Sequence, residues 1–76
     1  MPTIATLDGI RIYIYFGDHN PPHVHAYAAE NDGKFRIADS VMIAGDLPTK
    51  DQRKVRDWLN DNREIAAQKW REIAEA

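Results

Sequence analysis

The chain of 76 residues contains no cysteine, which excludes disulfide bonds, a thiol nucleophile and any cysteine-based zinc site. No apolar run approaches the roughly 20 residues that a membrane-spanning helix needs. The N-terminal stretch MPTIATLDG also lacks the basic start and long apolar core of a signal peptide. We therefore expect a cytoplasmic protein with no membrane partner, in which any metal ion is bound by histidine and carboxylate.

An excess of positive charge is lacking as well, because 10 Lys and Arg residues stand against 12 Asp and Glu, for a formal net charge of -2. This balance argues against a generic binder of polyanions, for which a basic domain is expected. Four of the basic residues are nevertheless concentrated in KDQRKVR, residues 50–56. Lys50, Arg53 and Lys54 are candidate contacts for an anionic partner, and a solvated surface is the alternative.

The overall composition, with 43% hydrophobic and 29% charged residues, is ordinary for a small globular protein. A chain of this length is too short for two cores. We expect residues 1–76 to form a single domain, with a β-meander over residues 1–46 and a helical segment over residues 49–75.

Strict alternation of side-chain type predicts strands in the first half. TIATL, the turn Asp8-Gly9 and IRIYIYF read as a hairpin. Since side chains alternate across a strand, the apolar set of the second strand should face the core, namely Ile10, Ile12, Ile14 and Phe16. Arg11, Tyr13 and Tyr15 should face the other way.

Further strands are predicted in HVHAYAA, KFRIA and VMIAG, separated by turns at ENDG (residues 30–33) and at Asp39-Ser40. The remainder reads as helix, because Thr49 and Gln52 match a capping box and apolar residues recur at helical spacing. That apolar stripe comprises Val55, Trp58, Leu59, Ala66, Trp70 and Ile73, with Ile65 at its edge. One long helix with a kink near Asn60 to Asn62 is expected, and two helices, the second capped by Asp61 and Glu64, are the alternative.

The fold class that follows is α+β: a small antiparallel β-meander of four or five strands packed on a C-terminal amphipathic helix. The isoleucine face of the sheet should meet the helix, because isoleucine has no polar atom to satisfy. Both tryptophans should anchor the core.

All three histidines lie in FGDHNPPHVHAY, residues 16–27, around a pair of prolines. The prolines end the loop, and the alternation after them places His23, His25 and Tyr27 on one strand face. If the second and third strands pair, this face continues onto Arg11, Tyr13 and Tyr15, opposite the helix.

Three interpretations of this face compete. In the catalytic one, His23 and His25 transfer protons and are supported by His19 and Asp18, as in metal-free RNA cleavage. Arg11 binds phosphate, Tyr13 and Tyr15 stack on bases, and Tyr27 lies on the same face. In the metal interpretation, His19, His23 and His25 bind zinc or nickel, with Asp18 or water completing a tetrahedral site, although we expect no cofactor. In the structural one, the prolines stiffen the loop and the histidines bond to nearby backbone.

The sequence resembles the bacterial domain of unknown function 4160 family, through DGIRIYIYFGDHNPPHVHAY, the later GDLP and the helical VRDWLNDNREIAAQKW. The run from Asp18 to His25 matches the family's pattern. Other members often have a histidine in the helix where this chain has Asn62, so a role for a helix histidine does not carry over.

The resemblance implies a toxin-antitoxin setting. The expected function is therefore a toxin-like component of such a module that engages or cleaves RNA and binds a cognate small antitoxin-like protein. A non-enzymatic protein-protein interaction module with a structural His-Pro-Pro-His loop is the alternative, and a histidine-based metal-binding protein is the second.

Overall fold

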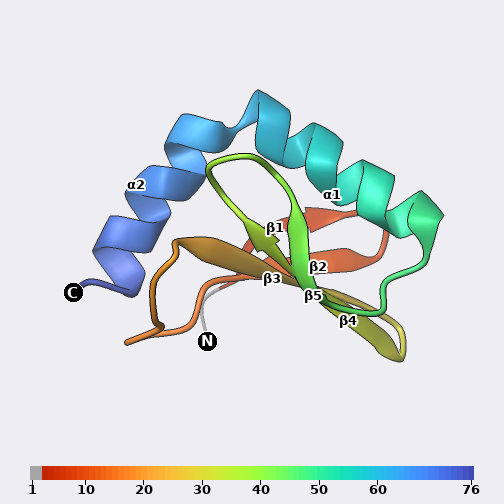
Figure 1. Ribbon diagram of the computed structural model, residues 1–76, viewed down its shortest axis with the longest axis horizontal. Helices are drawn as coiled ribbons and strands as arrows, with labels where there is room; N and C mark the ends of the chain where they lie inside the picture. The colour runs from red at the N-terminus through yellow and green to blue at the C-terminus, as the bar shows by residue number, and fades with distance from the viewer. Residues whose placement is uncertain (1–2) are drawn as a thin grey trace.

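The computed structural model describes residues 3–76 and contains five strands followed by two helices (Figure 1). The elements are β1 (Thr3–Leu7), β2 (Ile10–Tyr13), β3 (His23–Ala28), β4 (Asn31–Arg36), β5 (Met42–Gly45), α1 (Thr49–Asp61) and α2 (Arg63–Ile73). The strands form one antiparallel sheet in the order β1-β2-β3-β4-β5, and both helices arch over one face of it (Figure 1). The α+β meander is confirmed. The first two residues of the predicted domain lie outside the described residues.

The core lies between the isoleucine face of the sheet and the helices. Ile12 and Ile14 are fully buried against a helical stripe that includes Val55, Leu59 and Trp70. The prediction that the isoleucine face meets the helical segment is confirmed. Of the two tryptophans, Trp70 is buried, whereas Trp58 is only partly buried at the edge of the core.

Two expectations for the sheet were wrong. Phe16 was expected in the core, but its side chain is 78% exposed. Strand β2 ends at Tyr13 and the chain turns at Phe16 and Gly17, where φ is 71°, so the period of two no longer applies there.

The turn predicted at ENDG, residues 30–33, was placed too far along the chain. The turn is formed by Ala29 and Glu30, and the next three residues already belong to β4. Gly33 signals close packing rather than a turn, because a Cβ atom there would lie 3.0 Å from the Met42 sulfur and 3.1 Å from the Leu47 side chain.

The helical segment is split at Asn62, so the two-helix alternative holds. Asn62 has φ -129° and ψ 28°, which are not helical, and its side-chain amide donates to the Trp58 carbonyl at 2.9 Å. The expected cap of the second helix by Asp61 and Glu64 was wrong, because Asn62 occupies the N-cap position without a side-chain cap bond.

The capping box at the first helix was also wrong. Pro48 is the N-cap residue of α1 and makes no side-chain bond, and Thr49 is already the first helical residue. Gln52 instead reaches back past the helix start, and its amide donates to the Leu47 carbonyl at 2.7 Å. This bond satisfies the carbonyl of a buried residue at the point where the chain leaves the sheet.

Within residues 3–76, neither helix is long and apolar enough to cross a bilayer.

Candidate functional site

The face of the sheet opposite the helices gathers the predicted polar and aromatic residues. Strands β2 and β3 pair so that Tyr13 lies opposite His25 and Arg11 lies opposite Tyr27. Directly paired residues of an antiparallel sheet point to the same side, so the predicted common face is confirmed. We call these residues, together with Tyr15, the Tyr/Arg face.

The Tyr/Arg face is hollowed. A pocket of about 270 Å³ is lined by four of its side chains and one alanine, namely Arg11, Tyr13, Tyr15, Tyr27 and Ala29. The Arg11 guanidinium lies 5.9 Å from the centre of the Tyr13 ring, within the range of a cation–π contact. The pocket therefore combines one exposed cation with aromatic walls.

Two tyrosines of this pocket are joined through their hydroxyl groups. Tyr15 and Tyr27 form a short hydrogen bond, and this bond, with burial as a smaller contribution, raises the pKa of Tyr27 to about 12. Tyr13 packs edge-on against Tyr27 with ring centres 5.3 Å apart. The Tyr27 hydroxyl therefore stays protonated at neutral pH and can act as a hydrogen-bond donor.

Beside this pocket, the loop before β3 brings Asp18 over the two strand histidines. Asp18 Oδ2 lies 2.9 Å from His25 Nε2 and 3.0 Å from His23 Nε2. The other oxygen of the carboxylate accepts the backbone N–H of His19 at 2.9 Å. We call Asp18, His23 and His25 the His/Asp cluster.

His23 is the deepest member of the cluster, with 3% of its surface exposed. Its Nδ1 lies 2.7 Å from the Pro21 carbonyl oxygen, and because a carbonyl only accepts, Nδ1 must carry the proton. Its ring packs between His25 and Trp70, with centres 4.9 Å and 5.2 Å away. The His23 ring is thus fixed by contacts on both sides.

The second nitrogen of His23 is left without a hydrogen bond. Its Nε2 is buried and finds no hydrogen-bond partner among residues 3–76. The Asp18 oxygen at 3.0 Å is close enough for an ion pair, but the angles of the approach do not make a hydrogen bond. This is an exception to the rule that buried polar atoms are paired.

Electrostatics keep His25 neutral and Asp18 ionised at neutral pH. Burial lowers the pKa of His25, and its hydrogen bond to Asp18 opposes that shift only in part. For Asp18, burial alone would raise the pKa, but the hydrogen bonds from His25 and from the His19 backbone lower it below its usual value. The carboxylate therefore carries a negative charge next to two imidazoles.

The ligand set considered from the sequence, His19, His23 and His25, is not the one that the structure brings together. His19 is exposed and contributes its backbone N–H rather than its ring. The donor atoms of the His/Asp cluster all lie within 4.8 Å of one another. These three residues could therefore hold a metal ion.

The basic residues of the 50–56 segment lie apart from this site. Lys50, Arg53 and Lys54 belong to α1, which covers the opposite face of the sheet (Figure 1). The Lys54 ammonium lies 3.5 Å from the Asp8 carboxylate and links α1 to the first hairpin. Lys50 and Arg53 are exposed.

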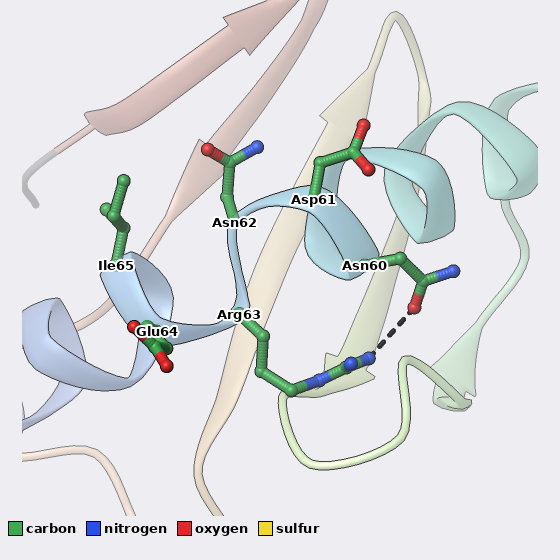
Figure 2. Close-up of a pocket in the computed structure, with 6 residues that line it drawn as sticks. All are labelled: Asn60, Asp61, Asn62, Arg63, Glu64 and Ile65. Carbon is green, nitrogen blue, oxygen red and sulfur yellow. Dashed lines mark hydrogen bonds between the residues drawn. The ribbon is translucent and has the colours of Figure 1, made fainter.

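A second hollow, of about 450 Å³, lies at the break between the helices and is lined by residues 60–65 (Figure 2). Figure 2 shows the Arg63 side chain reaching from this break toward Asn60, with an N···O distance of 2.9 Å. The same guanidinium donates to the Ile37 carbonyl at 2.8 Å and to the Ser40 hydroxyl at 2.6 Å. The hydrogen bonds of Arg63 thus link the break between the helices to the connection between β4 and β5.

Two neighbours of the site were missed from the sequence. Lys34 lies opposite His25 on β4, on the same face, and Trp70 reaches His23 from α2. Lys34 could have been found from the alternation of KFRIA, had the turn before it been placed at Ala29 and Glu30. No periodic signal pairs His23 with Trp70, because they lie on different elements.

Comparisons with known proteins yield one match. The comparison with curated proteins and the comparison with solved structures found no match. A family model matches residues 9–71, which includes the whole Tyr/Arg face and the His/Asp cluster. Because this match covers far more than half of the 76 residues, the chain belongs to the family described as domain of unknown function (DUF4160).

Proposed function

We propose that the chain is the toxin-like component of a cytoplasmic bacterial toxin-antitoxin module and that it engages RNA through the Tyr/Arg face. The observation that carries this proposal is the pocket in which Arg11 lies among three tyrosines, next to the His/Asp cluster. Recognition of single-stranded RNA combines stacking of bases on aromatic rings with cationic contacts to phosphate. The pocket offers both kinds of contact.

This face carries basic as well as acidic side chains, because Asp32 lies opposite Tyr27 and Lys34 lies opposite His25. Arg11 and Lys34 flank the tyrosines and His25, although the chain as a whole is acidic. Phosphate contacts come from such local cations, so the net charge of -2 does not prevent binding at this face. It does limit the affinity expected at high salt.

His25 is the histidine that bound RNA would meet. It is half-buried, it packs against Tyr15 with ring centres 4.3 Å apart, and it is neutral at pH 7 because its pKa is lowered by burial. A neutral imidazole held by a carboxylate can accept a proton from a 2′-hydroxyl. His23 is too deep to touch substrate, so its contribution to cleavage would be to position Asp18 and His25.

The test is binding of labelled single-stranded RNA, followed by fluorescence anisotropy at several salt concentrations. Arg11→Gln should weaken binding by about tenfold, the effect of losing one charge-assisted bond. Arg71→Gln is the matched control, because Arg71 is exposed on α2 and the charge change is the same. Equal RNA affinities of the wild type and Arg11→Gln would contradict the proposal. A loss of RNA affinity in Arg53→Gln alone would place the RNA-binding surface on α1.

Toxicity is tested in the same variants. Expression of the wild-type chain should arrest growth, and Arg11→Gln and His25→Ala should relieve the arrest while Arg71→Gln does not. RNA recovered from arrested cells shows whether binding is accompanied by cleavage. Growth that continues normally on expression of a soluble wild-type chain would contradict the toxin role.

The alternative function is a non-enzymatic interaction module, and the sheet edge favours it. Strand β5 ends the sheet, and the apolar side chains of Val41 and Ile43 are 45% and 38% exposed there. A free edge can pair with an extended segment of a partner, here the cognate antitoxin-like protein. Co-purification in equal amounts, lost on Ile43→Lys and retained on Arg11→Gln, together with no binding of RNA, would establish this alternative.

A further inference from the structure

We propose that Asp18, His23 and His25 bind a divalent transition-metal ion of the zinc type through Asp18 Oδ2 and the two histidine Nε2 atoms. Two observations point to a ligand at this place. The three donor atoms converge within 4.8 Å, and one of them, His23 Nε2, is buried without a hydrogen-bond partner in the described chain.

The first argument comes from the proton on His23. Its Nδ1–H is engaged by the Pro21 carbonyl at 2.7 Å, so in a neutral imidazole Nε2 carries a lone pair. That lone pair lies 3.0 Å from an oxygen of an ionised carboxylate. Two such atoms repel each other at this distance, and a metal ion bound by both would remove this repulsion.

The angles at this pair suit a metal ion better than a hydrogen bond. A proton on Nε2 would have to point at the Asp18 oxygen to form a good bond, but the approach lacks hydrogen-bond geometry. A metal ion lies off the line that joins two of its ligands, so it needs no such alignment. The angles of the contact between His23 Nε2 and the Asp18 oxygen therefore favour a metal ion.

The distances are close to those of a real site. Ligand atoms about 2.0–2.2 Å from a tetrahedral zinc ion lie about 3.3–3.6 Å from one another. Here the Asp18 oxygen lies 2.9 Å and 3.0 Å from the two nitrogens, so these two distances must open by about half an ångström, while all three donor atoms lie within 4.8 Å of one another. Exchange of the His25 proton between its two ring nitrogens would free the lone pair on its Nε2, and His25 would then hold the ion instead of accepting a proton from RNA.

The outer contacts of a metal site are also present. A metal-binding histidine usually donates its other ring N–H to a carbonyl or carboxylate, as His23 does to Pro21. A metal-binding carboxylate is usually hydrogen-bonded through its free oxygen, as Asp18 is by the His19 backbone. Trp70 fixes the His23 ring from the other side.

Three protein ligands leave a fourth position open to water or substrate. The cluster adjoins the Tyr/Arg face through the contact of His25 with Tyr15. The ion would therefore lie next to the pocket in which we propose that RNA binds. The metal proposal does not rest on that function, because metal binding is measured without RNA.

The experiment is titration of the untagged, metal-stripped chain with Zn²⁺ or Ni²⁺, followed by calorimetry and thermal unfolding, with Mg²⁺ for comparison. We expect one Zn²⁺ or Ni²⁺ per chain, a higher melting temperature on binding, and no effect of Mg²⁺. Asp18→Asn and His25→Ala should each weaken binding by about a hundredfold or more, since removal of an outer contact alone costs roughly 10- to 100-fold. These two positions are chosen because His23→Ala removes a buried ring and can unfold the chain.

His19→Ala is the matched control, because it removes the third histidine while leaving the backbone N–H that Asp18 accepts. Binding should survive this change. Absence of stoichiometric binding by the wild type would overturn the proposal, and so would binding that is lost with His19→Ala but not with Asp18→Asn. If metal binds as expected while RNA does not, only the proposed RNA function fails.

Discussion

The rings of His23 and Trp70 lie with their centres 5.2 Å apart, although one residue opens strand β3 and the other lies near the end of the last helix. His23 is 3% exposed and Trp70 is 2% exposed, so this contact closes the core at one end of the sheet. The histidine motif is thereby part of the packing as well as of the candidate site.

His23→Ala should lower the free energy of unfolding by about 2–4 kcal/mol, because it leaves a cavity beside Trp70 and an unpaired Pro21 carbonyl. His19→Ala, at an exposed position, should change it by less than about 0.5 kcal/mol. Urea unfolding measures both. Equal stabilities of the two variants would show that the His23 ring contributes nothing to packing.

Stability should fall on acidification, and His25 should cause the first part of the decline. Its pKa in the folded chain is lowered from 6.5 by burial, so below about pH 6.5 the unfolded chain takes up a proton that the folded chain resists. His25→Gln should flatten the dependence of the unfolding free energy on pH below about pH 6.5. His19→Gln serves as the comparison, and an unchanged slope in His25→Gln would contradict the assignment.

Asp18 should cause a later part of the decline. Its pKa is held below 3.8, because the hydrogen bonds from His25 and His19 outweigh the opposing effect of burial. The stabilisation is complete above about pH 4 and is lost as the pH falls through the lower, folded value. Asp18→Asn should remove the loss of stability that protonation of Asp18 causes at low pH. The free energy of unfolding, measured from pH 5 downward, would show this.

Tyr15→Phe should return the pKa of Tyr27 from about 12 toward 10, because the hydrogen bond between the two hydroxyls is the largest cause of the shift. The absorbance of tyrosinate, followed as the pH is raised, measures this in a chain with only three tyrosines. In the wild type, Tyr27 should ionise only at about pH 12. Identical titration curves for the wild type and Tyr15→Phe would mean that the hydroxyl pair does not persist in solution.

Arg63→Met should destabilise the chain by about 1–3 kcal/mol, because it leaves the Ile37 carbonyl and the Ser40 hydroxyl without their donor. Arg71→Met changes the same side chain on the exposed side of α2 and should have little effect. Thermal unfolding of the two variants gives the comparison. A similar loss in both would indicate a general effect of charge on the helix.

The common face of β2 and β3 could be predicted because period-two alternation and a two-residue hairpin are local properties. Asp8 and Gly9 have φ of 43° and 81°, as the predicted tight turn requires, and the strict alternation of IRIY then fixes which side chains share a face. Alternation does not say where a strand stops, so Phe16 was placed wrongly.

The central role of Asp18 could be predicted only in part. The sequence identifies it as a companion of the histidines, but its position depends on the path of an irregular loop, which has no period. Composition also misled at Asn31-Asp32-Gly33, which resembles a turn although it lies in β4 and Gly33 packs closely against the Met42 side chain. The enclosure of His23 by Trp70 is a tertiary contact that no local pattern encodes.

The order of the strands also bears on how the protein folds. Each strand pairs with its neighbour in the chain, so hairpins that close early bring the Tyr/Arg face together from nearby residues. The enclosure of His23 must wait for a helix that begins forty residues later, at Arg63. During synthesis on the ribosome, the Tyr/Arg face can therefore form while the chain is still growing, whereas the enclosure of His23 is completed only when the last helix has emerged and docked.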